Sequence, residues 1–189
     1  MLATDSAVYD WFGFNRGLFL FVNGIRAPLI DSLMVGISWL GHPRMFPYYI
    51  ASMLVLAWRT PASMPLRNVV TFAASYALTS ALIIPVMKAA FDLPRPAEVL
   101  GDQVIAVLGD PGTGHAFPSG HSAFAVLTAC SLMPGATRGA RTALAIVAAL
   151  VCLSRVSVGA HFPADVVAGA VIAAAVVTCV RLALGTRSG

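Results

Sequence analysis

The stretch PADVVAGAVIAAAVVTCVRLAL forms residues 163–184 and contains only two charged side chains, Asp165 near its start and Arg181 near its end. A bilayer core about 30 Å thick needs roughly 20 apolar residues for each helical crossing. This stretch is long and apolar enough to be one membrane-spanning helix.

Three further stretches have the same character and lie at residues 67–91, 119–134 and 141–159. Residues 29–58 are also apolar, but GHPR (41–44) interrupts them, which predicts either one kinked crossing or two half-segments that meet there. With 58% hydrophobic and 11% charged residues among 189, the composition lies outside that of soluble globular proteins. We therefore predict an all-α integral membrane bundle of five or six transmembrane helices, in a single domain over residues 1–189.

Residues 1–27 mix aromatic and polar residues (YDWFGFNRGLFLFVNGIR at 9–26), and their uninterrupted apolar part is too short to cross a bilayer. We expect an amphipathic helix in the membrane interface, with Tyr9 and Trp11 at headgroup depth; a short first crossing is the alternative. No basic region precedes an apolar core here, so no cleavable signal peptide is expected. Residues 28–189 then form the helical core, in which residues 92–118, rich in proline, glycine and aspartate, are expected to be a loop.

Basic residues at the helix ends predict the orientation of the bundle. Alternation of the spans places six of them on one side, namely Arg59, Arg67, Arg138, Arg141, Arg181 and Arg187. By the positive-inside rule that side is cytoplasmic. The junctions at residues 88–121 and 154–165 then lie on the extracytoplasmic face of a multi-pass protein in the cell inner membrane.

Charge and cysteine usage exclude two other classes. The net charge is +4, but the twelve Lys and Arg are scattered at helix ends instead of gathered on one face, so no nucleic-acid partner is expected. Cys130, Cys152 and Cys179 are odd in number and lie in apolar stretches, so neither a disulfide framework nor a cysteine metal site is expected.

Polar residues that are costly to place near hydrocarbon gather at the extracytoplasmic junctions: Lys88, Arg95, Ser119, His121, Ser154, Arg155, His161 and Asp165. Their summed charge is positive, which favours an anion such as phosphate, whose oxygens accept both point charges and planar guanidinium groups. Ser119 follows Pro118 as a predicted helix N-cap, so the backbone N–H groups of Gly120 and His121 would form an anion cradle. Ser154 and Ser157 are expected to make helix-end hydrogen bonds.

His161 and Asp165 are four residues apart, with Pro163 suited to a first helical turn. This spacing predicts that the carboxylate accepts the proton of one ring nitrogen and leaves the other nitrogen as a nucleophile. With His121 as proton donor, a two-step phosphoryl transfer through a phosphohistidine becomes feasible. Lys88, Arg95 and Arg155 would then stabilise the charge on the transferring phosphoryl group.

Three motifs, KAAFDLPRP (88–96), PSGH (118–121) and SRVSVGAHFPAD (154–165), together resemble the signature of the type 2 phosphatidic acid phosphatase superfamily. The resemblance implies a nucleophile at His161, its orienting carboxylate at Asp165 and a general acid at His121. It also implies phosphate binding by Lys88, Arg95, Ser119, Gly120 and Arg155, with no metal and no cofactor. One departure is that Ala97 and Glu98 follow Arg95-Pro96, where many members repeat Arg-Pro.

The function expected from these features is that of an integral-membrane lipid phosphate or pyrophosphate phosphatase. The short chain resembles compact bacterial members, so undecaprenyl pyrophosphate is the first candidate substrate, and phosphatidate, phosphatidylglycerophosphate and lipid A phosphates are alternatives. A vanadate-dependent haloperoxidase-like enzyme and a non-catalytic lipid-binding or transport protein are the rival classes. The sequence does not indicate the oligomeric state.

A zinc site is the rival chemistry for the same residues. It would use His115, His121, His161 and Asp165. Three nearby cations would repel a dication and argue against it. As a loop residue, His115 is expected to be a spectator or to line the substrate entry, and Arg44 has no predicted partner.

Overall fold

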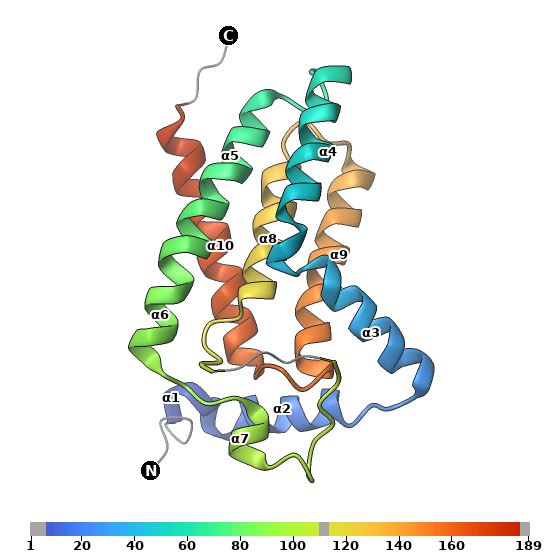
Figure 1. Cartoon of the computed structure of the whole chain (residues 1–189), viewed down its shortest axis with the longest axis vertical. Helices are drawn as coiled ribbons and strands as arrows, with labels where there is room; N and C mark the ends of the chain where they lie inside the picture. Colours follow the sequence, from blue (N-terminus) through green and yellow to red (C-terminus); the bar gives the residue numbers. More distant parts are fainter. Residues whose placement is uncertain (1–6, 110–113, 186–189) are drawn as a thin grey trace.

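The structure is a computed structural model that describes residues 7–109 and 114–185, and the regular structure within those residues is entirely helical. The helices that run along the long axis of the bundle are α4 (Phe46–Arg59), α5 (Leu66–Tyr76), α6 (Ile84–Phe91), α8 (Gly120–Leu132), α9 (Arg138–Ser157) and α10 (Pro163–Ala183) (Figure 1). This arrangement confirms the predicted all-α bundle. By length and composition, three helical segments can each cross a membrane: Leu66–Leu100, Arg138–Ser157 and Pro163–Ala183.

Helices α5 and α6 form one continuous crossing, because the π-helical segment Ala77–Ile83 joins them. Pro85, which cannot donate a backbone hydrogen bond, follows this segment in the first turn of α6. Single π-helical turns are frequent at functional sites. Here the π segment contains Ser80, which faces the cavity described below.

Residues 29–58 form two helices that meet at GHPR, which is one of the two arrangements predicted. Helix α3 (Pro28–Leu40) ends at Gly41, and a short 3-10 turn (Pro43–Met45) leads into α4. The His42 ring accepts a hydrogen bond from the backbone N–H of Arg44 at 3.0 Å, which closes the turn. Neither helix alone reaches the roughly 20 residues of a full crossing.

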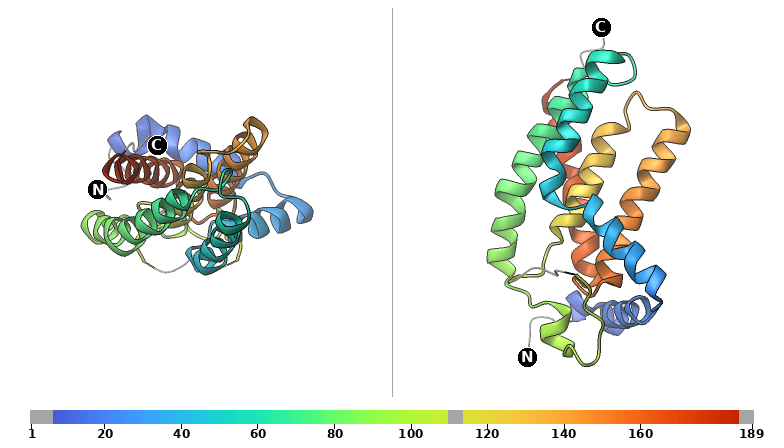
Figure 2. Two further views of the ribbon diagram at one scale, coloured as in Figure 1. Left: turned by 90° about the horizontal axis from the view of Figure 1, so that it is seen from above. Right: turned by 45° about the vertical axis from the view of Figure 1, so that its right-hand side comes forward.

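The N-terminal helices lie across one end of the bundle (Figures 1 and 2). Helices α1 (Ala7–Asp10) and α2 (Phe14–Asn23) are found there together with α7 (Pro96–Leu100). The segment Trp11–Asn23 makes an angle of 117° with α3. Trp11–Asn23 and α3 are together long and apolar enough for one bent crossing, so this placement is compatible both with the predicted interfacial helix and with the first crossing that was its alternative.

Helix α2 buries polar side chains and exposes apolar ones, which is the reverse of an amphipathic helix on the surface of a soluble protein. Asn15, Phe19 and Asn23, spaced by four, are buried against the bundle, whereas Phe14 and Phe21 are 61% and 69% exposed. Apolar residues that face outward suit a lipid environment. The buried asparagines bind the backbone of the core, since Asn23 donates to the carbonyls of Ala106 and Ser157.

One prediction about the connections is wrong. Residues 92–118 were expected to be loop, but they contain α7, a single turn that starts at Pro96. Proline at the first helical position has the required φ and no amide hydrogen bond to lose. A turn this short has no apolar periodicity, so the composition concealed it.

Helix α8 is the central helix and packs against α5, α9 and α10. Apolar side chains lie on all sides of α8, and Phe124 and Leu127 are almost fully buried. Rings from α4 and α5 surround Phe124, with centroids 5.6 Å from Tyr49, 6.1 Å from Phe72 and 5.6 Å from Tyr76. Such aromatic packing fixes the start of α8, where the candidate site lies.

The alternation of the helices places the basic helix ends together at one end of the bundle, as predicted. Several helix ends lie at the upper end of the bundle in Figure 1: the end of α4, the start of α5, both ends of the α8–α9 connection and the end of α10. These are the positions of Arg59, Arg67, Arg138, Arg141 and Arg181. Arg187 was predicted to join them but lies outside the described residues.

Candidate active site

Four separate parts of the chain, one of them the α3–α4 turn with His42 and Pro43, meet toward the lower end of the bundle in Figure 1 and line a cavity of about 410 Å³. Lys88 comes from α6, Gly120 and His121 from the start of α8, Arg155 from the end of α9, and His161 from the α9–α10 connection. The complete lining of this main cavity is His42, Pro43, Tyr76, Ser80, Ile84, Lys88, Arg95, Gly120, His121, Arg155 and His161. Three of the described lining residues are cationic and none is a carboxylate, so the main cavity suits an anion.

Backbone carbonyls hold two of these cations in place. The Lys88 ammonium donates to the carbonyl of His115 at 2.6 Å. Arg95 donates from Nε to Gly114 and from Nη1 to Ala160, both at 3.0 Å. Charges held in this way need little rearrangement when an anion binds.

The third cation is deeply buried. Arg155 is only 3% exposed and lies in the last turn of α9, and its Nη1 donates to the hydroxyl of Ser38 in α3. A buried charge is stable only when it is well paired or hydrogen-bonded. Its burial beside two histidines makes a bound anion favourable.

His161 and Asp165 are in contact, as the i,i+4 spacing predicted. The imidazole Nδ1 lies 3.3 Å from Asp165 Oδ2, and the side chains of both residues are almost completely buried. Asp165 lies in the first turn of α10, where its Oδ2 also accepts the backbone N–H of Phe162 at 3.0 Å. The carboxylate therefore lies behind His161, and His161 alone of the two lines the main cavity.

The sequence did not predict that a third residue, Tyr9, contacts this pair. The Tyr9 hydroxyl donates to Asp165 Oδ1 at 2.6 Å, across 156 positions of sequence. The Tyr9 ring packs edge-on against Phe117 and Phe162. The N-terminal segment thus contributes a side chain to the support of His161, although Tyr9 was predicted only to lie at headgroup depth.

Burial shifts the pKa values of His161 and Tyr9, which lie outside the membrane spans. Desolvation, followed by the positive charges of Arg155 and Arg95, lowers the pKa of the His161 imidazole well below its usual range. Desolvation and the neighbouring Asp165 carboxylate raise the pKa of the Tyr9 hydroxyl. His161 is therefore neutral and Tyr9 protonated at neutral pH, which are the forms of a nucleophile and a hydrogen-bond donor.

Ser119 is the N-cap of α8, as predicted. Its hydroxyl accepts from the backbone N–H of Ser122 at 3.5 Å and from the Ser122 hydroxyl at 3.1 Å. Ser119 is fully buried and does not line the main cavity, whereas Gly120 and His121 do. The first turn of α8 thus presents its N-terminal end to the main cavity, where the helix dipole favours an anion.

Comparisons with known proteins identify the family of the chain. The model of the PAP2 superfamily matches residues 67–188, which include α5 from its second residue, the helices from α6 to α10 and the lining residues from Tyr76 onward. The chain belongs to the PAP2 superfamily. It is a membrane protein of a lipid phosphatase family, as the three sequence motifs indicated.

Individual PAP2 proteins are similar over most of the chain. An undecaprenyl-diphosphatase of Sulfolobus acidocaldarius is 28% identical over 157 residues, which are 83% of this chain and 72% of that protein. The crystal structure of Aquifex aeolicus LpxE has a TM-score of 0.79 at 27% identity and covers 96% of this chain and 99% of that one. A PAP2-type phosphatidylglycerolphosphate phosphatase from Bacillus subtilis has a TM-score of 0.74 at 21% identity, covering 99% and 92%, and shows the fold alone.

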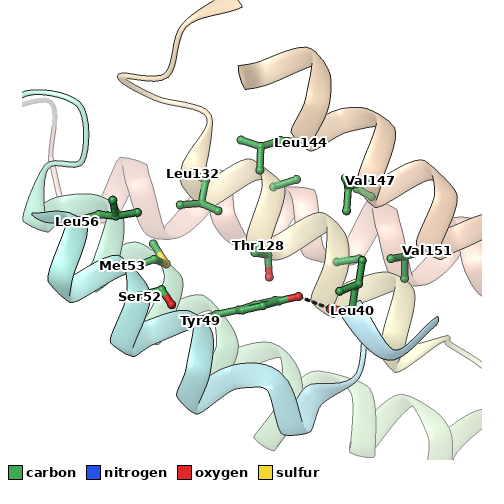
Figure 3. Close-up of a pocket in the computed structure, with 13 residues that line it drawn as sticks. Leu40, Tyr49, Ser52, Met53, Leu56, Thr128, Leu132, Leu144, Val147 and Val151 are labelled. Carbon is green, nitrogen blue, oxygen red and sulfur yellow. Dashed lines mark hydrogen bonds between the residues drawn. The ribbon is translucent and has the colours of Figure 1, made fainter. Parts of the chain in front are cut away.

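Two other cavities of the bundle differ in their chemistry. The side cavity, of about 140 Å³, is lined by Val35, Ser38, Trp39, His42, Arg44, Leu108, Gly109, His121, Arg155 and Val158. The apolar groove, of about 230 Å³, lies between α4, α8 and α9 (Figure 3) and is lined by Leu40, Tyr49, Ser52, Met53, Leu56, Ala125, Thr128, Ala129, Leu132, Leu144, Val147, Ala148 and Val151. No lining residue of the apolar groove is charged, so it lacks the cations that the other two cavities offer to an anion.

The remaining predicted residues have defined places. His115 lies outside the main cavity and its Nδ1 contacts Asp92 Oδ1 at 2.5 Å, so the structure does not bring it to the zinc ligands of the rival hypothesis. Across residues 7–109 and 114–185, no three His, Cys, Asp or Glu side chains gather as a metal site. Ser154 donates to the carbonyl of Val151 at 2.6 Å, the helix-end bond expected of it. The carbonyl and hydroxyl of Ser157 accept from Arg26 instead.

Proposed function

We propose that this PAP2 protein hydrolyses the terminal phosphate of a membrane lipid phosphate or pyrophosphate through a phosphohistidine formed on His161. The observation that carries the proposal is the buried Asp165–His161 pair at the wall of a cavity with three cations. Asp165 holds the imidazole proton on Nδ1, so that Nε2 carries the lone pair that attacks phosphorus.

In the first step a bond forms between His161 Nε2 and phosphorus while the bond from phosphorus to the leaving oxygen breaks. The leaving oxygen keeps the electron pair and takes a proton from His121, which lines the same cavity. Lys88, Arg95 and Arg155 stabilise the charge on the phosphoryl oxygens, and the N-terminal end of α8 at Gly120 accommodates one of them. Ser119 supports that turn as its cap.

In the second step water attacks the phosphohistidine and gives up a proton to His121, which acts now as the base. The bond between nitrogen and phosphorus breaks, inorganic phosphate leaves, and His161 returns to its neutral form. No step uses a metal ion, because the three cations supply the positive charge that the transferring group needs.

We infer that undecaprenyl pyrophosphate is the first candidate substrate. The similarity to the Sulfolobus undecaprenyl-diphosphatase supports this choice. Phosphatidate, phosphatidylglycerophosphate and lipid A phosphates are the alternatives. We also propose that the site faces the extracytoplasmic side of the inner membrane, since the basic helix ends lie at the opposite end of the bundle.

Release of phosphate from purified protein tests the proposal. The panel consists of undecaprenyl pyrophosphate, phosphatidate, phosphatidylglycerophosphate and lipid A, each with the wild type and with His161→Ala. Turnover that is lost in His161→Ala supports the proposal, and turnover that persists there refutes the assigned nucleophile. Retained lipid binding with no turnover by the wild type would indicate a binding or transport protein instead. Peroxide-dependent halogenation would indicate the haloperoxidase class.

A further inference from the structure

The side cavity adjoins the main cavity and shares three of its lining residues, His42, His121 and Arg155. His161 lines the main cavity and not the side cavity. In a phosphoryl transfer the attacking and leaving atoms lie roughly in line on opposite sides of phosphorus. Because His121 protonates the leaving oxygen in the proposed mechanism, the side cavity lies on the leaving-group side.

The lining of the side cavity suits an anionic leaving group. Arg44 and Arg155 are cationic, Ser38 and His42 offer polar atoms, and none of the described lining residues is acidic. A phosphomonoester hydrolysis would release a neutral alcohol, for which Arg44, the cation that lines the side cavity and not the main cavity, has no use. A diphosphate hydrolysis releases a lipid monophosphate, whose oxygens match two guanidinium groups.

We propose that the side cavity binds the lipid-proximal phosphate of a diphosphate substrate, with Arg44 and His42 as its specific ligands. This inference rests on the proposed function and narrows it to lipid diphosphates. The bond from the terminal phosphorus to the bridging oxygen breaks, the bridging oxygen leaves with its electron pair on the lipid monophosphate, and it takes the proton of His121.

The GHPR turn is built to bring these two residues to the site. A Cβ on Gly41 would lie 2.3 Å from Val151 Cγ1 and 3.0 Å from the carbonyl oxygen of His121, so only glycine permits this approach of α3 to α8 and α9. The His42 ring meets the His121 ring edge-on, with centroids 4.9 Å apart.

The contacts of the His42 ring also indicate which of its nitrogens carries the proton. The ring stacks on Trp39, with centroids 5.1 Å apart and an interplanar angle of 20°. Its Nδ1 accepts the backbone N–H of Arg44 at 3.0 Å, so the neutral ring carries its proton on Nε2. His42 is therefore held as a hydrogen-bond donor next to the general acid, and it directs the Arg44 backbone into the same turn.

Steady-state hydrolysis of two substrates with the same tail, undecaprenyl diphosphate and undecaprenyl phosphate, tests the inference. Arg44→Gln is the test variant, and Arg59→Gln, an exposed arginine at the other end of the bundle, is the matched control. We expect Arg44→Gln to lower kcat/KM for the diphosphate by 10- to 100-fold more than for the monophosphate. His42→Ala should change the same ratio in the same direction, and Arg59→Gln should change neither rate.

Equal losses on both substrates, or no loss on either, would overturn the side-cavity assignment, as would a wild type that cleaves the monophosphate as well as the diphosphate. Each of these results leaves the phosphatase proposal intact, because wild-type turnover that depends on His161 is still observed. Absence of wild-type turnover on both substrates would instead contradict the proposed function.

A binding measurement further separates the side-cavity assignment from the proposed phosphatase function. In the His161→Ala background we expect undecaprenyl diphosphate to bind at least tenfold more tightly than undecaprenyl phosphate. Adding Arg44→Gln should abolish that difference, and a difference that survives would overturn the inference.

Discussion

The contact between Asp165 and His161 makes a quantitative prediction for Asp165→Asn. Asparagine has nearly the same shape as aspartate, so its amide oxygen can still accept the N–H of Phe162 and the Nδ1 proton of His161. Its amide group then faces the Tyr9 hydroxyl, which turns to accept a hydrogen bond. The variant should therefore fold and keep the correct imidazole tautomer, losing only the negative charge.

The cost of losing that charge follows from the distance. Positive charge develops on the imidazole as it bonds to phosphorus, 3.3 Å from the carboxylate oxygen. At an effective dielectric constant of about 20, two unit charges at this distance interact with about 5 kcal/mol. Loss of that stabilisation in the transition state corresponds to a rate reduction of roughly 10³- to 10⁴-fold.

The assay is phosphate release under saturating lipid substrate, with the thermal unfolding of each variant recorded in the same detergent. Asp102→Asn, an exposed aspartate in the α7 region, is the matched control and should keep the wild-type rate. A kcat for Asp165→Asn within tenfold of the wild type would refute the electrostatic role of Asp165. A kcat loss accompanied by unfolding would show that the residue acts through stability.

Four further predictions follow from the same structure. Tyr9→Phe removes one hydrogen bond to Asp165 and should lower kcat about 10-fold with little change in KM, whereas an unchanged kcat would show that Tyr9 does not position the carboxylate. Because the pKa of His161 in the folded state lies below its unfolded value near 6.5, the stability that its neutral form contributes is present above pH 6.5 and is lost as the pH falls below that value. Unfolding scans in detergent should therefore show that the free energy of unfolding falls more steeply toward acid pH in the wild type than in His161→Gln, by up to about 1.4 kcal/mol per pH unit. Parallel curves for the two proteins would contradict this prediction. Phe124→Ala should reduce the free energy of unfolding by about 3–5 kcal/mol, against less than about 1 kcal/mol for the lipid-exposed Phe14→Ala, and equal losses would contradict the assigned core. EDTA should leave phosphate release unchanged, and inhibition that added zinc reverses would restore the metal alternative.

The sequence predicted the parts of the fold that depend on local composition. Long apolar stretches predicted α9 and α10 closely, and Pro118-Ser119 predicted the start of α8, because burial in lipid and helix capping are both local requirements. The turn α7 was missed, since a single turn has no apolar periodicity.

The sequence likewise predicted the parts of the candidate site that depend on local spacing and missed those that depend on long-range contacts. The i,i+4 spacing predicted the contact of His161 with Asp165, because both lie at the start of one helix. Tyr9 and His42 were missed, since they reach the site from the N-terminal segment and from the α3–α4 turn through contacts across long sequence separations. The local signals that could have drawn attention to them are the buried-face spacing of Asn15 and Asn23 and the GHPR interruption of an apolar stretch.

Detection of the covalent intermediate tests the central claim most directly. Purified protein is mixed with substrate labelled in its terminal phosphate, quenched in alkaline detergent within milliseconds to seconds, and digested for mass spectrometry. The account predicts a phosphohistidine on the peptide that contains His161, formed at a rate no slower than turnover and absent from His161→Ala. Phosphate on another residue, or single-turnover hydrolysis that never labels the protein, would contradict it.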